Sequence, residues 1–122
     1  MGFGPILEGL IGDCPGALGA VLLGKDGIAV AQATRSVHDP LAEDFGVLGA
    51  EFSRVLEETR RASGASGAGE VAEAWFHLDR FRLGLCRINA ELVLALAMEV
   101  DGNLGQARYL IRRNRSAILS EA

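Results

Sequence analysis

In the first third of the chain, the spacing of apolar residues changes from that of a helix to that of strands. Apolar side chains at positions 3, 6, 7, 10 and 11 follow the spacing of a helix with one apolar face. The sequence Asp13-Cys14-Pro15-Gly16 then contains residues that end helices. Residues 17–23 and 28–33 have the apolar composition of strands, and the turn sequence Gly24-Lys25-Asp26-Gly27 separates them. We therefore predict a helix followed by a β-hairpin.

Residues 41–62 return to a helical period. Their apolar positions recur at spacings of three and four, which is typical of a helix that lies along another helix. A line of small residues flanks this seam: Ala42, Gly46, Gly49, Ala50 and Ser53. Glycine inside a helix costs up to about 1 kcal/mol relative to alanine, so two glycines here indicate the close approach of another backbone. Loose packing over a sheet is the alternative.

The second half of the chain contains three predicted strands and a last helix. After a Gly/Ala/Ser-rich linker at residues 63–69, residues 71–78 and 81–88 alternate between two faces. Residues 92–98 are apolar at every position, which is typical of a strand covered on both faces, so we place this strand at the centre of the sheet. Asp101-Gly102-Asn103 supplies a helix N-cap, and apolar positions 104, 107, 111 and 118 follow it.

These elements predict one α+β domain over residues 1–122, in the order helix, two strands, helix, three strands, helix. A central strand covered on both faces requires helices on both sides of the sheet, which gives three layers. The chain is 49% hydrophobic and 23% charged, as expected for a globular protein. Cys14 and Cys86 have apolar neighbours and no metal-ligand spacing, so we expect two buried thiols. With no signal peptide and no apolar run of about 18 residues, we expect a cytoplasmic protein without membrane insertion.

Charge is distributed unevenly along the chain. Residues 1–58 hold nine acidic and three basic side chains, whereas residues 59–122 hold seven acidic and nine basic ones. The net charge of −4 and the absence of a dense basic stretch argue against a nucleic-acid partner. Eleven of the twelve basic residues are arginines, which suit bidentate contacts with carboxylates at protein interfaces.

Three segments resemble catalytic or ligand-binding motifs without meeting their requirements. Residues 19–25 match the first seven positions of a phosphate-binding P-loop, but Asp26 stands where Ser or Thr is needed and a strand follows instead of a helix. The glycines of residues 64–69 precede a strand rather than a helix, so they favour a linker. His38 and Asp39 could form a base and its orienting carboxylate, but no Ser or Cys occurs in a sequence pattern typical of a catalytic nucleophile. We expect no catalytic residue, cofactor or metal.

Three features point instead to protein binding. Arg108, Arg112 and Arg115 lie at i, i+4 and i+7 on the outer side of the last helix. There they complement the helix dipole, bind an acidic protein surface, or interact with Glu121 and neighbouring carboxylates. Trp75 falls on a predicted edge strand, and an exposed edge tryptophan is typical of an interface anchor. The hairpin tip places an apolar side chain beside two charges, in the set Lys25, Asp26 and Ile28.

Two stretches of the sequence resemble the Roadblock/dynein light chain family. One is the hairpin sequence Gly16-Ala-Leu-Gly-Ala-Val-Leu-Leu-Gly-Lys-Asp-Gly-Ile-Ala-Val-Ala31. The other, Met98-Glu-Val-Asp-Gly-Asn-Leu-Gly-Gln-Ala-Arg-Tyr-Leu-Ile-Arg112, is similar to the bacterial MglC branch, which is related to the MglB regulators of a Ras-like polarity GTPase. The element order extends the resemblance over nearly the whole chain.

The resemblance implies a three-layer α/β/α fold with a five-stranded antiparallel sheet in the order 2-1-5-4-3. It also implies a homodimer that pairs the third strand and the long second helix of each copy. Transferred to this sequence, the dimer interface comprises Phe45, Leu48, Gly49, Phe52, Ser53, Leu56, Val71, Glu73, Trp75 and His77.

The function implied by the resemblance is regulation of a small GTPase rather than catalysis. The expected role is a non-catalytic adaptor in a polarity or motility system, which binds an MglB-like Roadblock protein and, directly or through it, a Ras-like GTPase. Direct activation of GTP hydrolysis is the alternative, which the lack of a longer C-terminal tail disfavours. A small-molecule sensor is a third possibility, because related three-layer folds hold ligands against the sheet.

Overall fold

The computed structural model describes the backbone of residues 2–35 and 41–122, and the side chains of these residues except 41–44. Helices and strands follow one another in the order that the sequence predicts. They are α1 (Phe3–Asp13), β1 (Ala17–Gly24), β2 (Ala29–Thr34), α2 (Leu41–Ala65), β3 (Glu73–His77), β4 (Arg82–Arg87), β5 (Leu92–Met98) and α3 (Leu104–Glu121).

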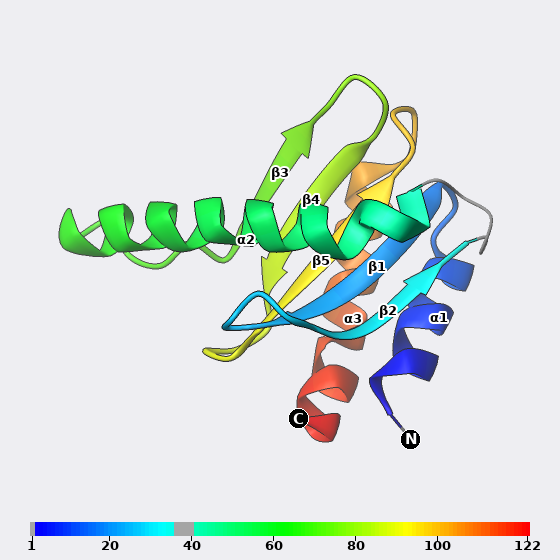
Figure 1. The fold of residues 1–122 in the computed structure, drawn as a ribbon, viewed down its shortest axis with the longest axis horizontal. Coiled ribbons are helices and arrows are strands. Elements are labelled where there is room, and N and C mark those ends of the chain that lie inside the picture. The colour runs from blue at the N-terminus through cyan, green and yellow to red at the C-terminus, as the bar shows by residue number, and fades with distance from the viewer. Residues whose placement is uncertain (1, 36–40) are drawn as a thin grey trace.

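The five strands form one antiparallel sheet in the order β2-β1-β5-β4-β3 (Figure 1). β5 lies between β1 and β4, and all seven of its residues are buried. The central position predicted for residues 92–98 is therefore confirmed, as is the strand order that the family resemblance implies. At the opposite end of the order from β2, β3 forms an edge of the sheet.

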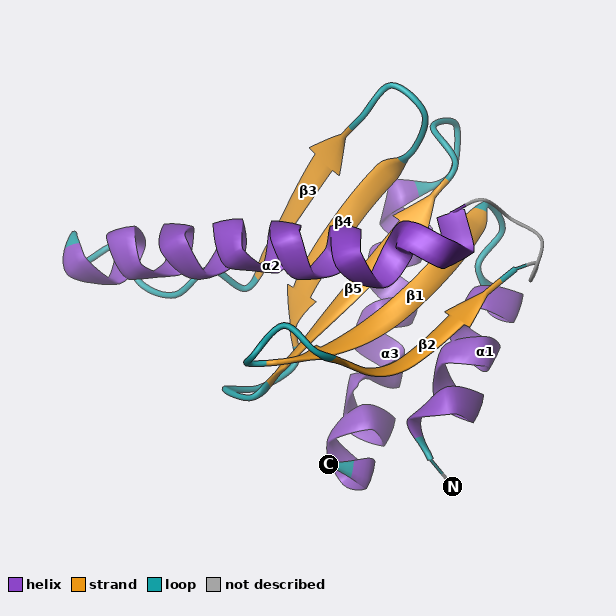
Figure 2. Ribbon diagram, viewed as in Figure 1, coloured by secondary structure: helices purple, strands orange, loops and turns teal. Residues whose placement is uncertain are grey.

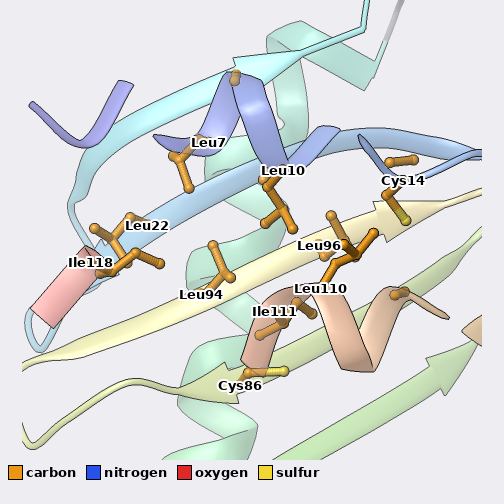
Figure 3. Packing of buried hydrophobic residues seen from close by; sticks show 14 of the residues in the cluster. Leu7, Leu10, Cys14, Leu22, Cys86, Leu94, Leu96, Leu110, Ile111 and Ile118 are labelled. Atoms are coloured by element: carbon orange, nitrogen blue, oxygen red, sulfur yellow. The ribbon is translucent and has the colours of Figure 1, made fainter. Parts of the chain in front are cut away.

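Two helices cover one face of the sheet and a single helix covers the other (Figure 2). On the two-helix face, leucines of α1 pack with side chains from β1, β5 and α3 in one apolar cluster. Figure 3 shows this packing, in which Leu7 and Leu10 of α1 approach Leu22, Leu94 and Leu96 of the sheet. Asn103 begins α3 as predicted, because its Oδ1 accepts a hydrogen bond from the Gln106 backbone N–H at 3.0 Å.

On the other face, α2 packs closely on the strands beneath it. A methyl group added at Gly49 would lie 3.2 Å from Val21 Cγ1 and 3.3 Å from Leu23 Cδ1. Any larger residue at this position would force these side chains to shift, so glycine favours the close approach of the helix to β1. The glycine-rich line of α2 does mark a close approach, but the partner at Gly49 is the chain's own sheet.

The boundaries of several elements differ from the prediction. β3 and β4 are shorter at both ends than the predicted ranges 71–78 and 81–88, and β1 ends one residue later than predicted. The helix predicted to end at residue 62 continues to Ala65, because Ser66 N–H still donates to the Ala62 carbonyl and Ala68 N–H donates to the Ser63 carbonyl. The first three residues of the predicted linker are thus helical. The second strand begins and ends one residue later than predicted, and a register shift in β1 lies opposite its start.

Trp75 lies against its own sheet rather than in solvent. It pairs with Gly84 across β3 and β4, and its ring atoms Cη2 and Cζ3 would lie 2.5 Å from a Cβ added at Gly84. The ring is partly buried and packs against the cluster on the two-helix face. The prediction that Trp75 is an exposed anchor was wrong, because sequence alone does not show the glycine that leaves room for the ring on the neighbouring strand.

Replacement of Gly84 by alanine should displace this ring. We expect Gly84→Ala to lower the free energy of unfolding by about 1–3 kcal/mol, as overpacking typically does. Trp75 is the only tryptophan, so its fluorescence emission maximum should shift to longer wavelength as the ring moves toward water. Urea unfolding and the emission spectrum of the native state measure both effects.

Gly9→Ala is the matched control. Nothing lies within 4 Å of a Cβ added at Gly9 in α1, so alanine there should raise stability by about 0.5–1 kcal/mol through helix propensity. If Gly84→Ala leaves the emission maximum and the stability unchanged, the ring does not rest on Gly84.

Candidate protein-interaction surfaces

The segments that resemble catalytic motifs have other roles in the fold. Residues 19–24 of the P-loop-like sequence lie in β1, and Lys25 begins the turn after it. Cys14 and Cys86 are both buried free thiols, as predicted. Among the described residues, no group of His, Cys, Asp and Glu could hold a metal ion, and none of the helices is both long and apolar enough to cross a lipid bilayer. His38 and Asp39 lie outside the described residues.

The hairpin tip between β1 and β2 is a rigid, exposed turn. The Ile28 N–H donates to Asp26 Oδ1 at 3.0 Å, and the Gly24 N–H donates to the Ile28 carbonyl at 2.9 Å. Gly27 has a φ of 82°, which glycine adopts without strain. The turn holds the Ile28 side chain 65% exposed, beside exposed Lys25. The three residues predicted to bind a partner are thus together at one accessible tip.

A second exposed apolar surface runs along one side of α2. We call it the apolar flank; it consists of Leu18, Leu48, Phe52, Val55, Phe76 and Phe81. Five of its members are partly buried against the sheet, and Val55 is 47% exposed. Phe52 and Phe76 meet edge to face, with ring centroids 4.8 Å apart. One helix does not cover this face of the sheet completely, so the flank remains open to water.

The predicted dimer residues divide between the core and the surface. Phe45, Gly49, Ser53 and Leu56 are buried within the subunit, so their side chains cannot contact a second copy in this arrangement. The 3.5-residue seam fits packing against a sheet as well as against a helix, which is why the pattern did not separate the two. The remaining members of the set are accessible to different degrees: Leu48, Phe52, Val71, Glu73 and Trp75 are partly buried, and His77 is exposed.

The arginines of α3 do not lie in its last turn, which contains no basic residue. The interpretation of Arg108, Arg112 and Arg115 as partners of the helix dipole was therefore wrong, because that effect is confined to the last turn. Instead, all three line a hollow between α3 and the adjoining ends of β3 and β4. Arg108 forms an ion pair with Glu73, and Arg115 Nη2 donates to the Ile88 carbonyl at 2.6 Å.

A network of charges connects α2 to the sheet near this hollow. Glu57 forms ion pairs with Arg87 of β4 and with Arg60, whose Nη1 also lies 3.2 Å from Glu70 Oε2. The hydrogen bond from Arg87 is the main cause that lowers the pKa of the Glu57 carboxyl below its usual range. This network was missed in the sequence because its members lie in three separate segments.

Comparison with known proteins supports the fold assignment. No protein-family model and no curated protein matches the sequence. Solved structures do match: a Roadblock/LC7 domain from Streptomyces avermitilis has a TM-score of 0.85 at 18% identity, over 98% of this chain and 97% of that chain. The chain therefore has the Roadblock/LC7 fold.

Mgl proteins are among the matching structures. The gliding protein MglB from Thermus thermophilus has a TM-score of 0.82 at 18% identity, over 97% of this chain and 86% of that chain. MglC from Myxococcus xanthus has a TM-score of 0.69 at 26% identity, and both chains are covered over 100%. The resemblance that the sequence indicates thus extends to structure over nearly the whole chain.

Removal of the Glu57 charge should destabilise the protein in a pH-dependent way. We expect Glu57→Gln to cost about 1–2 kcal/mol at neutral pH, because Arg87 is mostly buried and loses its carboxylate partner. The folded-state pKa is lowered, so the unfolded chain takes up this proton first as pH falls. The difference between wild type and variant should therefore shrink below about pH 4.5, the ordinary value for this group. Urea unfolding at a series of pH values between about 3 and 7, which spans the titration of carboxyl groups, measures this difference in stability.

Glu51→Gln is the control for this change. Glu51 pairs with Arg54 at 3.0 Å on the same helix, but both side chains are well exposed. Exposed pairs of this kind contribute about 0.3–0.5 kcal/mol. Equal losses in the two variants, or a Glu57→Gln loss that does not change with pH, would contradict the role assigned to the network.

Proposed function

We propose that this chain is a non-catalytic adaptor in a bacterial Ras-like small-GTPase system for polarity or motility. It acts as a cytoplasmic homodimer that binds an MglB-like Roadblock protein and, directly or through it, the GTPase. The observation that carries the proposal is the apolar flank beside the free edge of β3, in a fold shared with MglB and MglC. The family resemblance supplies the GTPase context.

The dimer proposal follows from what the subunit leaves uncovered. The apolar flank combines two aromatic rings of the β3–β4 region with Leu48 and Val55 of α2. At about 25 cal/mol per Å² of apolar area removed from water, covering such a surface favours association. Next to it, the outer edge of β3 has no neighbouring strand in the described chain, so its backbone groups can pair with a second β3. A second copy supplies a complementary helix and strand together.

The hairpin tip is the proposed contact for the MglB-like partner. Its backbone is held by three hydrogen bonds within the turn, so little conformational entropy is lost when it binds. Ile28 provides an exposed apolar group, while Lys25 and Asp26 provide charges that fix orientation. The tip lies outside the apolar flank, so partner binding and dimerisation use different surfaces.

A charge placed on the apolar flank should prevent dimerisation. We expect Val55→Arg to convert the dimer to a monomer that keeps its fold, because the Val55 side chain is 47% exposed and contributes little to the core. Light scattering gives the mass, and circular dichroism checks the fold. Phe52 and Trp75 are poorer positions for this test, since both pack against the sheet of their own subunit.

Val47→Arg is the matched control on the same helix. Val47 is 67% exposed and lies between buried Phe45 and Gly49 in sequence, so it points away from the sheet. It should leave the dimer intact. A dimer that survives Val55→Arg, or a wild type that is monomeric, would contradict the proposed assembly.

A charge at the hairpin tip should weaken the partner complex without changing the dimer. We expect Ile28→Asp to raise the Kd for the MglB-like protein of the same organism by about tenfold, in line with the loss of one buried apolar contact and the cost of burying a charge. Isothermal titration calorimetry measures the Kd. Val100→Asp is the comparison, because Val100 is exposed and follows the end of β5 that lies away from the hairpin tip.

A measurement of phosphate release during GTP hydrolysis distinguishes the adaptor proposal from the alternative, direct activation of the GTPase. The chain alone should not accelerate GTP hydrolysis by the Ras-like GTPase of the same organism. Acceleration in the absence of an MglB-like protein would replace the adaptor proposal by direct activation.

For the hairpin tip, equal affinity of wild type and Ile28→Asp for the MglB-like partner would contradict the proposed contact at Ile28.

A further inference from the structure

An arginine-lined hollow of about 320 Å³ lies where α3 passes the adjoining ends of β3 and β4. We call it the arginine hollow; the residues that matter here are Glu73, Cys86, Arg87, Arg108, Arg112 and Arg115. Helical spacing alone brings the three α3 arginines to one side of the helix. The fold then adds a fourth, Arg87 from β4, which no sequence pattern connects to them.

The charges in the arginine hollow do not balance. Glu73 neutralises Arg108, and Glu57 neutralises Arg87. Arg115 is held by the Ile88 carbonyl, which orients the guanidinium but carries no net charge. Arg112 is exposed and has neither a hydrogen bond nor an ion pair with any described residue. Two guanidinium charges therefore remain without a carboxylate.

The floor of the hollow cannot supply the missing negative charge. Burial raises the pKa of the Cys86 thiol to about 12, and the nearby Glu73 carboxylate acts in the same direction. The attraction of Arg108 and Arg112 for a thiolate does not overcome these effects. The thiol therefore stays neutral at physiological pH, which leaves the two arginines available to an anion from outside the subunit.

The cationic surface continues beyond this hollow. A second hollow of about 360 Å³ shares Arg87 and Arg115 with the first, and Lys25 of the hairpin tip lines its other side. Its two carboxylates, Glu57 and Glu70, are both held by Arg60. The two hollows together form a track from α3 to the hairpin tip. Cationic side chains from α3, β4 and the hairpin tip line it, so it offers several neighbouring contacts to an extended chain rather than one site for a small ion.

We propose that the arginine hollow binds an acidic segment of a partner protein, whose carboxylates are received by Arg112 and Arg115. This inference rests on the proposed role as a protein-binding adaptor and names the chemistry of its partner. Guanidinium forks match carboxylates in bidentate geometry, which favours a peptide carrying Asp or Glu. Nucleic acid and anionic membranes fit less well, because they favour a broad positive face and the chain has a net charge of −4.

Binding of a labelled acidic peptide tests the inference on the full chain. The probe is fluorescein-labelled hexaglutamate, followed by fluorescence anisotropy, with hexaglutamine as the uncharged peptide. Wild type should bind hexaglutamate saturably and hexaglutamine not at all. Arg112→Glu should raise the Kd by about tenfold or more, because it replaces an attraction by a repulsion. Arg112→Gln should give a smaller loss in the same direction.

Arg80→Glu is the charge-matched control. Arg80 is exposed in the turn between β3 and β4, at the far end of these strands from the arginine hollow. It changes the net charge by the same amount as Arg112→Glu, so a general electrostatic effect lowers affinity equally in both. We expect the Kd of Arg80→Glu to stay within about twofold of wild type at 0.15 M salt.

Several outcomes would overturn the inference. They are equal losses of affinity in Arg112→Glu and Arg80→Glu, or equal binding of the two peptides. Full displacement of hexaglutamate by inorganic phosphate would also overturn it, if the phosphate concentration is below the local concentration of carboxylates in the peptide. Binding to anionic vesicles but not to hexaglutamate would assign the surface to membranes instead. None of these results bears on dimerisation or on Ile28, so failure here is distinguishable from failure of the proposed function.

Discussion

The burial of β5 on both faces is the constraint on which the rest of the structure depends. Its seven residues are all apolar, so each face of this strand needs its own hydrophobic cover. Neighbouring strands must pair with both of its edges, because buried backbone groups need hydrogen-bond partners. β1 and β4 fill these places, which leaves β2 and β3 at the borders. The order of the sheet therefore follows largely from one run of residues.

The two covers of this strand are unequal, and the inequality has functional consequences. α1 and α3 share one face, where leucines from both helices close the core (Figure 3). α2 alone covers the other face and lies across the strands (Figure 1). Gly49 brings it close enough to seal the middle of the sheet, but not the region of Phe76 and Phe81. A stable core is thus compatible with an apolar surface that a second molecule can cover.

Local signals made most of the fold predictable from the sequence. The continuous apolar run of β5, the Asn103 cap and the turn at Asp26 each depend on a few adjacent residues, and all three were identified. The exposure of Phe45 and Trp75 was predicted wrongly because the burial of each depends on a distant partner. Phe45 packs on β1, and Trp75 needs the space above Gly84. Period and composition show that a side chain is apolar, but not whether its own subunit already buries it.

The same distinction applies to the charged residues. Arginines at i, i+4 and i+7 on α3 could be located from the sequence, but their environment could not, because Arg87 and Glu73 reach them through the sheet. The fold also joins two features that the sequence treats as separate. Lys25 of the hairpin tip and Arg115 of α3 line one hollow, although 90 positions separate them in the chain. A partner that contacts the tip through Ile28 can therefore extend an acidic segment along Arg115 to Arg112. One continuous surface, distinct from the apolar flank, can then serve partner binding while the flank serves assembly.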